Sequence, residues 1–103
     1  MVFSVEQHLP KERLAAFCHR RHIRKLSLFG SALHGELRPD SDIDLLAEFE
    51  AGHVPGLFDM TRMEIELTDL LGRQVDLRTP EELSQHFRGE VMQEAEAQYE
   101  AAK

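Results

Sequence analysis

Hydrophobic and polar residues alternate along this chain with two different periods, one typical of helices and one typical of strands. Over residues 10–22 the apolar positions recur at helical spacing behind a proline that suits a first helical turn, so we expect a helix there. Residues 25–29 alternate polar and apolar side chains, and residues 42–49 are rich in Ile and Leu, so both segments are predicted strands. A third strand is predicted over residues 74–78, closed by Thr79-Pro80.

The second half of the chain also carries two long apolar stripes at helical spacing. The first predicts a helix over residues 57–71, with Gly72 placed to terminate it. Its members are Leu57, Met60, Met63, Leu67, Leu70 and Leu71. The second predicts a last helical region from Glu81 onward, with a break near Gly89. Its members are Leu83, Phe87, Val91, Ala95 and Tyr99.

Predicted strands that alternate with predicted helices favour an α/β (α+β) fold, with a small mixed sheet of about three strands packed with helices. The 103 residues contain no repeat or linker-like stretch, so we expect a single domain over residues 1–103. A chain of this length can bury one hydrophobic core but has no room for a separate substrate-binding domain.

The charge balance and the cysteine content narrow the class of protein. Twelve basic and 19 acidic side chains give a formal net charge of −7, which argues against direct nucleic-acid binding because phosphate neutralisation needs a basic surface. The only cysteine, Cys18, cannot form an intramolecular disulfide. No apolar run resembles a signal peptide or a membrane-spanning helix, so we expect a cytoplasmic protein without a membrane partner.

Gly30 and Ser31 follow the first predicted strand and begin a short predicted helix over residues 31–36. A glycine at the end of a strand lets the backbone come close to a ligand. The free N–H groups and the dipole of a helix N-terminus favour an anion, and a triphosphate tail is such an anion. Taken alone, however, a Gly-Ser pair is more often an ordinary turn and helix cap.

Asp42 and Asp44 are two residues apart in the second predicted strand, so both carboxylates should project from one face while Ile43 and Leu45 point into the core. Two close carboxylates repel each other unless a cation lies between them. A cation with oxygen ligands that also shares phosphate oxygens is typically Mg²⁺. The pair therefore predicts a magnesium site beside Gly30 and Ser31.

A third carboxylate would complete a two-metal site for in-line displacement at phosphorus, and Asp76 is the best candidate. It stands between Val75 and Leu77, so it should face away from the core. If the third strand neighbours the second, Asp76 can bind the same metal or accept a proton from the attacking hydroxyl. An acid that simply faces solvent is the alternative.

The stretch from Leu28 to Leu46 resembles the Gly-Ser-x-x-x-Gly…Ser-Asp-x-Asp-Leu signature of the minimal nucleotidyltransferases, a family of the DNA polymerase β-like superfamily. The resemblance covers nearly the whole chain. Its further elements are Leu57-Phe58-Asp59, Leu70-Leu71-Gly72-Arg73, Val75-Asp76-Leu77 with Thr79-Pro80, and the acidic last segment. It implies a nucleotidyltransferase fold, phosphate contacts from Gly30 and Ser31, and catalytic, metal-binding roles for Asp42, Asp44 and Asp76.

The resemblance also implies a cofactor, a substrate and a partner. It implies Mg²⁺, with two ions in the two-metal case, and ATP as substrate. Members of the MntA-like antitoxin type are encoded beside a HEPN-type toxin, and some transfer AMP to a tyrosine of that toxin. One departure concerns the phosphate site: many members carry Arg before the second glycine, where this chain has His34 before Gly35.

The sequence excludes two other kinds of site. The spacing from Gly30 to Gly35 is similar to that of a Walker A loop, but Glu36 stands where the lysine is required and would repel phosphate. Cys18, His19 and His22 lack the second Cys/His pair that a zinc site needs.

Three functions therefore remain open at this point. The leading hypothesis is transfer of AMP from ATP to a hydroxyl of a partner protein. The second is a non-catalytic module that binds and neutralises its partner, with His34 marking a degenerate phosphate site. The third is nucleotidyl transfer to a small molecule, which would require a substrate-binding domain supplied by a partner chain.

Overall fold

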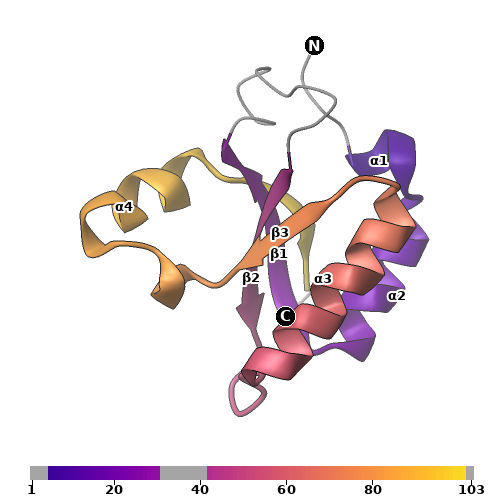
Figure 1. Ribbon diagram of the computed structural model, residues 1–103, viewed down its shortest axis with the longest axis horizontal. Coiled ribbons are helices and arrows are strands. Elements are labelled where there is room, and N and C mark those ends of the chain that lie inside the picture. Colours follow the sequence, from indigo (N-terminus) through magenta and orange to yellow (C-terminus); the bar gives the residue numbers. More distant parts are fainter. Residues whose placement is uncertain (1–4, 31–41, 102–103) are drawn as a thin grey trace.

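The computed structural model describes residues 5–30 and 42–101, which form a mixed sheet with helices on both sides (Figure 1). In chain order the elements are α1 (Val5–His8), α2 (Lys11–Arg20), β1 (Ile23–Phe29), β2 (Ile43–Phe49), α3 (Leu57–Leu71), β3 (Val75–Arg78), the 3-10 helix η2 (Pro80–Glu82), α4 (Gln85–Glu94) and β4 (Glu96–Glu100). The sheet order is β3-β2-β1-β4. Strands β2 and β3 are parallel, whereas β1 is antiparallel to both of its neighbours. The predicted α/β class with a small mixed sheet is confirmed.

One face of the sheet packs against α2 and α3, which lie side by side in Figure 1. The helices contribute Leu14, Phe17, Cys18, Met63, Leu67 and Leu71 to this core. Ile43 and Leu45 of β2 and Val75 and Leu77 of β3 point into it from the sheet. Because successive side chains of a strand alternate between faces, the residues between these positions project from the opposite face.

Helix α3 ends where the sequence predicts. Gly72 adopts a left-handed conformation, with φ of +73°, and its N–H donates to the carbonyl of Thr68 at 2.9 Å. The predicted apolar stripe is only partly buried, however. Met63, Leu67 and Leu71 are core residues, whereas Leu57 in the first turn is 80% exposed. The first turn of the helix therefore lies beyond the edge of the core.

Side chains of α3 also hold the outer edge of β3. The N–H of Val75 donates to Thr68 Oγ1 at 3.0 Å, and the N–H of Leu77 donates to Glu64 Oε2 at 2.8 Å. β3 is an edge strand of the described sheet, so no further strand accepts hydrogen bonds from these N–H groups. The side chains of α3 satisfy them instead. They fix β3 beside β2, which is the placement on which the candidate site depends.

The C-terminal segment differs from the prediction. The sequence predicts one helical region reaching Tyr99, but α4 ends at Glu94 and the chain continues as the edge strand β4. Ala95 has extended backbone angles, and Tyr99 lies opposite Leu26 of β1 with its side chain packed against the core. The spacing of Val91, Ala95 and Tyr99 fits a helix. Residues 96–100 nevertheless form a strand, because they pair with the open edge of β1. The sheet consequently has four strands.

Two other predictions concern the segment before β2. Asp42 lies immediately before the strand instead of within it, so the alternation rule applies to Asp44 alone. Ser31, His34 and the predicted helix over 31–36 fall outside the residues that the structure describes.

Candidate functional site

Asp44 and Asp76 lie directly opposite each other on the parallel strands β2 and β3. Their strand neighbours Ile43, Leu45 and Val75 face the α2–α3 core, so both carboxylates project from the other face of the sheet. Adjacent strands are about 4.8 Å apart. The condition that the sequence left open, that the third strand neighbours the second, is therefore met.

Gly30, which follows the last residue of β1, packs against the side chain of Asp44. Phe29, the last residue of β1, is the register partner of Asp44, and Gly30 follows it with φ of +76°. A Cβ at residue 30 would lie 3.2 Å from Asp44 Cγ and still closer to its Oδ2. Only glycine fits this position, both because of its backbone conformation and because the carboxyl group occupies the space of a side chain.

Burial and two nearby carboxylates act on the ionisation of Asp44. Partial burial raises the pKa of Asp44 above its ordinary value, and the negative charges of Asp76 and Asp42 raise it further. The guanidinium of Arg78 acts in the opposite direction and lowers this pKa. Asp44 is thus a carboxylate whose charged form is disfavoured in the protein until a cation compensates it.

Arg78 is a member of the site that sequence reasoning missed. Its Nε and one terminal nitrogen donate to Asp76 Oδ1 and Oδ2, at 3.1 and 3.3 Å. Arg78 is two residues after Asp76 on β3, so both side chains leave the same face. The signal in the sequence was this i, i+2 spacing of a base and an acid on a short strand.

The donor chemistry of these acids fits Mg²⁺, which prefers oxygen ligands and shares phosphate oxygens. The close approach of Gly30 keeps side-chain atoms away from one side of the Asp44 carboxyl. Over residues 5–30 and 42–101, however, no three acidic, histidine or cysteine side chains are gathered tightly enough to hold a metal ion. Arg78 engages both oxygens of Asp76, and Asp42 is exposed at the start of β2.

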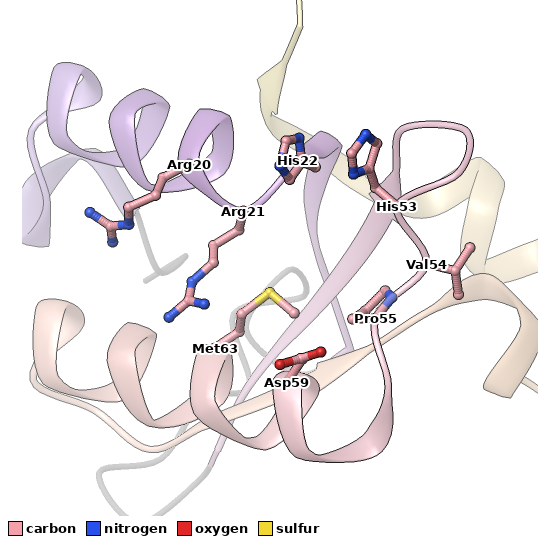
Figure 2. Close-up of a pocket in the computed structure, with 8 residues that line it drawn as sticks. All are labelled: Arg20, Arg21, His22, His53, Val54, Pro55, Asp59 and Met63. Atoms are coloured by element: carbon pink, nitrogen blue, oxygen red, sulfur yellow. The ribbon is translucent and has the colours of Figure 1, made fainter.

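A hollow lies between the end of α2, the β2–α3 loop and the first turns of α3, as Figure 2 shows. It measures about 240 Å³ and is lined in part by two arginines and two histidines. Arg20 and Arg21 both bind Glu66 of α3, the latter at 2.9 Å. The rings of His22 and His53 are stacked, with centroids 3.9 Å apart. Both guanidinium groups are thus held by one carboxylate, that of Glu66.

The environment of Cys18 agrees with the rejection of the zinc hypothesis. Cys18 is fully buried in the core, and burial raises the pKa of its thiol to about 12. A thiol in that state is a packing residue and not a metal ligand.

Comparison with known proteins identifies the family. Residues 11–97 match the model of the nucleotidyltransferase domain family. The chain is 36% identical over 72 residues to the protein adenylyltransferase MntA of Thermococcus cleftensis, covering 70% of this chain and 71% of that protein.

Two solved structures share the fold. A toxin–antitoxin crystal structure with AMP-PNP matches with a TM-score of 0.72 and 18% identity, over 90% of this chain and 75% of that one. A tri-AMPylated Shewanella oneidensis HEPN toxin in complex with its MNT antitoxin gives a TM-score of 0.64 and 15% identity, over 88% and 70% of the two chains. The family model matches most of the chain, and the fold agrees with that match. The chain therefore belongs to the nucleotidyltransferase domain family, as a minimal nucleotidyltransferase.

Proposed function

We propose that this chain transfers AMP from ATP to a tyrosine hydroxyl of a HEPN-type partner protein, with Mg²⁺ as cofactor, and thereby acts as an antitoxin. The observation that carries the proposal is the placement of Asp44 opposite Asp76, with Gly30 packed against Asp44. The name of the Thermococcus relative and the HEPN toxin complex support the acceptor and the partner.

The proposed reaction is an in-line displacement at the α-phosphorus of ATP. The acceptor oxygen forms a bond to this phosphorus, the bond to the bridging oxygen of the β-phosphate breaks, and pyrophosphate leaves. Asp76 accepts the proton of the hydroxyl, as a carboxylate within reach of the attacking group can. Asp42, Asp44 and Asp76 would hold Mg²⁺, which, when bound, offsets the charge of the phosphates.

Gly30 and Ser31 are proposed to contact the phosphates. Gly30 offers backbone without a side chain directly beside Asp44, which allows the close approach that a triphosphate requires. Arg78 holds the Asp76 carboxylate and supplies a positive charge on the same face. A cytoplasmic location is part of the proposal. In the part of the chain that the structure describes, no helix is long and apolar enough to span a membrane.

A non-catalytic binding module is the second candidate, because Arg78 occupies both oxygens of the carboxylate that would act as base. The two candidates predict different labels. We would incubate the chain with the HEPN-type protein encoded beside it, Mg²⁺, and ATP labelled at either the α- or the γ-phosphate. The proposal predicts that only the α-label enters the partner, and that Asp44→Asn abolishes it.

Three results of this experiment would contradict AMP transfer. A γ-label on the partner would identify phosphate transfer instead. Partner binding without any label would favour the binding module. Label on a small molecule in the mixture, and none on the protein, would indicate a small-molecule acceptor.

A further inference from the structure

Large apolar side chains are exposed in the first turn of α3 and in the loop just before it. Val54, Leu57 and Phe58 are 83%, 80% and 83% exposed, and they lie within five residues of one another. We refer to these three residues as the α3 apolar patch. Isolated exposed apolar residues are common, but a contiguous group typically marks an interaction site.

Leu57, one member of this patch, also lines a hollow that reaches the candidate active site. The hollow measures about 220 Å³ and is lined by Leu57, Met60 and Leu77 together with Asp76 and Arg78. Sites that hold whole small ligands span roughly 300–1,000 Å³. The volume of this hollow is smaller and suits a single side chain. One wall is therefore apolar, and another carries the carboxylate proposed to accept the proton.

The charges of the hollow restrict what it accepts. Three carboxylates line it, those of Glu64, Asp76 and Glu82, against the single cation Arg78. Glu64 is already bonded to the N–H of Leu77 at 2.8 Å. The excess of negative charge disfavours an acidic segment and favours a neutral or basic one with an apolar ring.

We infer that the α3 apolar patch is the docking surface for the acceptor protein, and that the adjoining hollow receives the acceptor side chain, an aromatic hydroxyl on a neutral or basic segment. The inference rests on the proposed function for the identity of the acceptor. It adds the place at which the acceptor docks: protein contact at Leu57 and Phe58, with the hydroxyl delivered to Asp76 through the adjoining hollow.

Helix α3 offers a matched control. Ile65 is also apolar and 58% exposed on the same helix, but it lies two turns from the patch and does not line the hollow. We would compare the double variant Leu57→Ser/Phe58→Ser with Ile65→Ser. All substituted side chains are largely exposed, so the fold should persist, as thermal unfolding would verify.

The readouts are the affinity for the neighbouring HEPN-type protein, the kinetics of AMP transfer to it, and Mg²⁺-dependent ATP binding. In the double variant, the Kd and the KM for the partner should each rise at least roughly tenfold, as at interface hot spots. ATP binding should remain close to wild type. In Ile65→Ser the Kd, the KM and ATP binding should all stay unchanged.

Unchanged partner affinity in the double variant, or an equal loss in Ile65→Ser, would overturn the docking surface. Concentration-dependent self-association that the double variant abolishes would instead make the patch a contact between two copies.

If wild type binds the partner through the patch but transfers no AMP, the surface stands and the proposed function fails. If wild type transfers AMP and the double variant does so equally well, the proposed function stands and the surface fails. If wild type neither binds nor labels the partner, both fail.

Discussion

Gly30 and the carboxyl group of Asp44 are packed so closely that residue 30 has no room for a side chain. The backbone of Gly30 is left-handed, and a Cβ there would stand 3.2 Å from Asp44 Cγ. The contact joins the end of β1 to the start of β2. It therefore ties the proposed phosphate position to the proposed metal ligand.

Gly30→Ala should impair both stability and transfer. The left-handed conformation costs an alanine about 1 kcal/mol, and the overlap with Asp44 adds to that or displaces the carboxyl group. We expect the unfolding free energy to fall by about 1–3 kcal/mol, and AMP transfer to fall more than about tenfold. Gly52→Ala is the control, since φ there is +81° but the described structure has no atom within 4 Å of its Cβ position. Equal destabilisation of the two variants, or undiminished transfer by Gly30→Ala, would contradict the contact.

Asp44→Asn should make the protein more stable at neutral pH. The pKa of Asp44 is raised in the folded protein by burial and by Asp76 and Asp42, so its charged form opposes folding. The wild-type penalty is absent below the unfolded pKa of about 3.9 and grows as the pH rises through the folded pKa. Urea unfolding across this range should show the two proteins converging in acid and Asp44→Asn exceeding wild type near pH 7. A gap between the two proteins that is independent of pH would exclude this explanation.

Arg78→Gln should increase the stabilisation that Mg²⁺ confers. The guanidinium engages both oxygens of Asp76 and lowers the pKa of Asp44, so it acts as an internal counter-cation for these acids. Without it, the unfolding free energy should fall by up to about 1 kcal/mol in the absence of metal. Added Mg²⁺ should then raise the melting temperature more than in wild type. Arg24→Gln removes the same charge from a pair with Glu48 and should leave the Mg²⁺ response unchanged. An equal response in all three proteins would contradict the role given to Arg78.

Gly72→Ala and Gly89→Ala should change stability in opposite directions. Gly72 caps α3 with φ of +73°, so alanine there should lower the unfolding free energy by about 1 kcal/mol. Gly89 lies inside α4, and the described structure leaves open space for a Cβ there. Alanine at 89 should raise the unfolding free energy by about 0.5–1 kcal/mol. Chemical denaturation of both variants measures this, and a shift of the same sign in both would contradict the helix assignments.

Local patterns were sufficient to predict most of the fold. Helix α3 and its glycine terminus follow from apolar spacing and from the one residue that tolerates a left-handed conformation. The strand β4 could not be predicted in this way, because its residues pair with β1, some 70 positions earlier in the chain. Where local spacing and a distant open edge compete, the sequence pattern alone does not decide between helix and strand.

The same distinction between local signals and long-range pairing applies to the candidate site. Asp44 could be recognised from its spacing to Asp42 and from the glycine before the turn. Its position opposite Asp76 depends on parallel pairing of β2 and β3 across the intervening helix, which sequence spacing does not encode. Arg78 was missed because a surface cation two residues from an acid is common, and only the geometry shows that both Asp76 oxygens are engaged.

Calorimetric titration with ATP tests most directly whether the acids beside Gly30 form a magnesium-dependent nucleotide site. We predict that wild type binds ATP in the presence of Mg²⁺, that EDTA removes this binding, and that Asp44→Asn lacks it while remaining folded. ATP binding of equal strength in EDTA, or in Asp44→Asn with Mg²⁺, would show that the nucleotide binds without these carboxylates and would contradict the site.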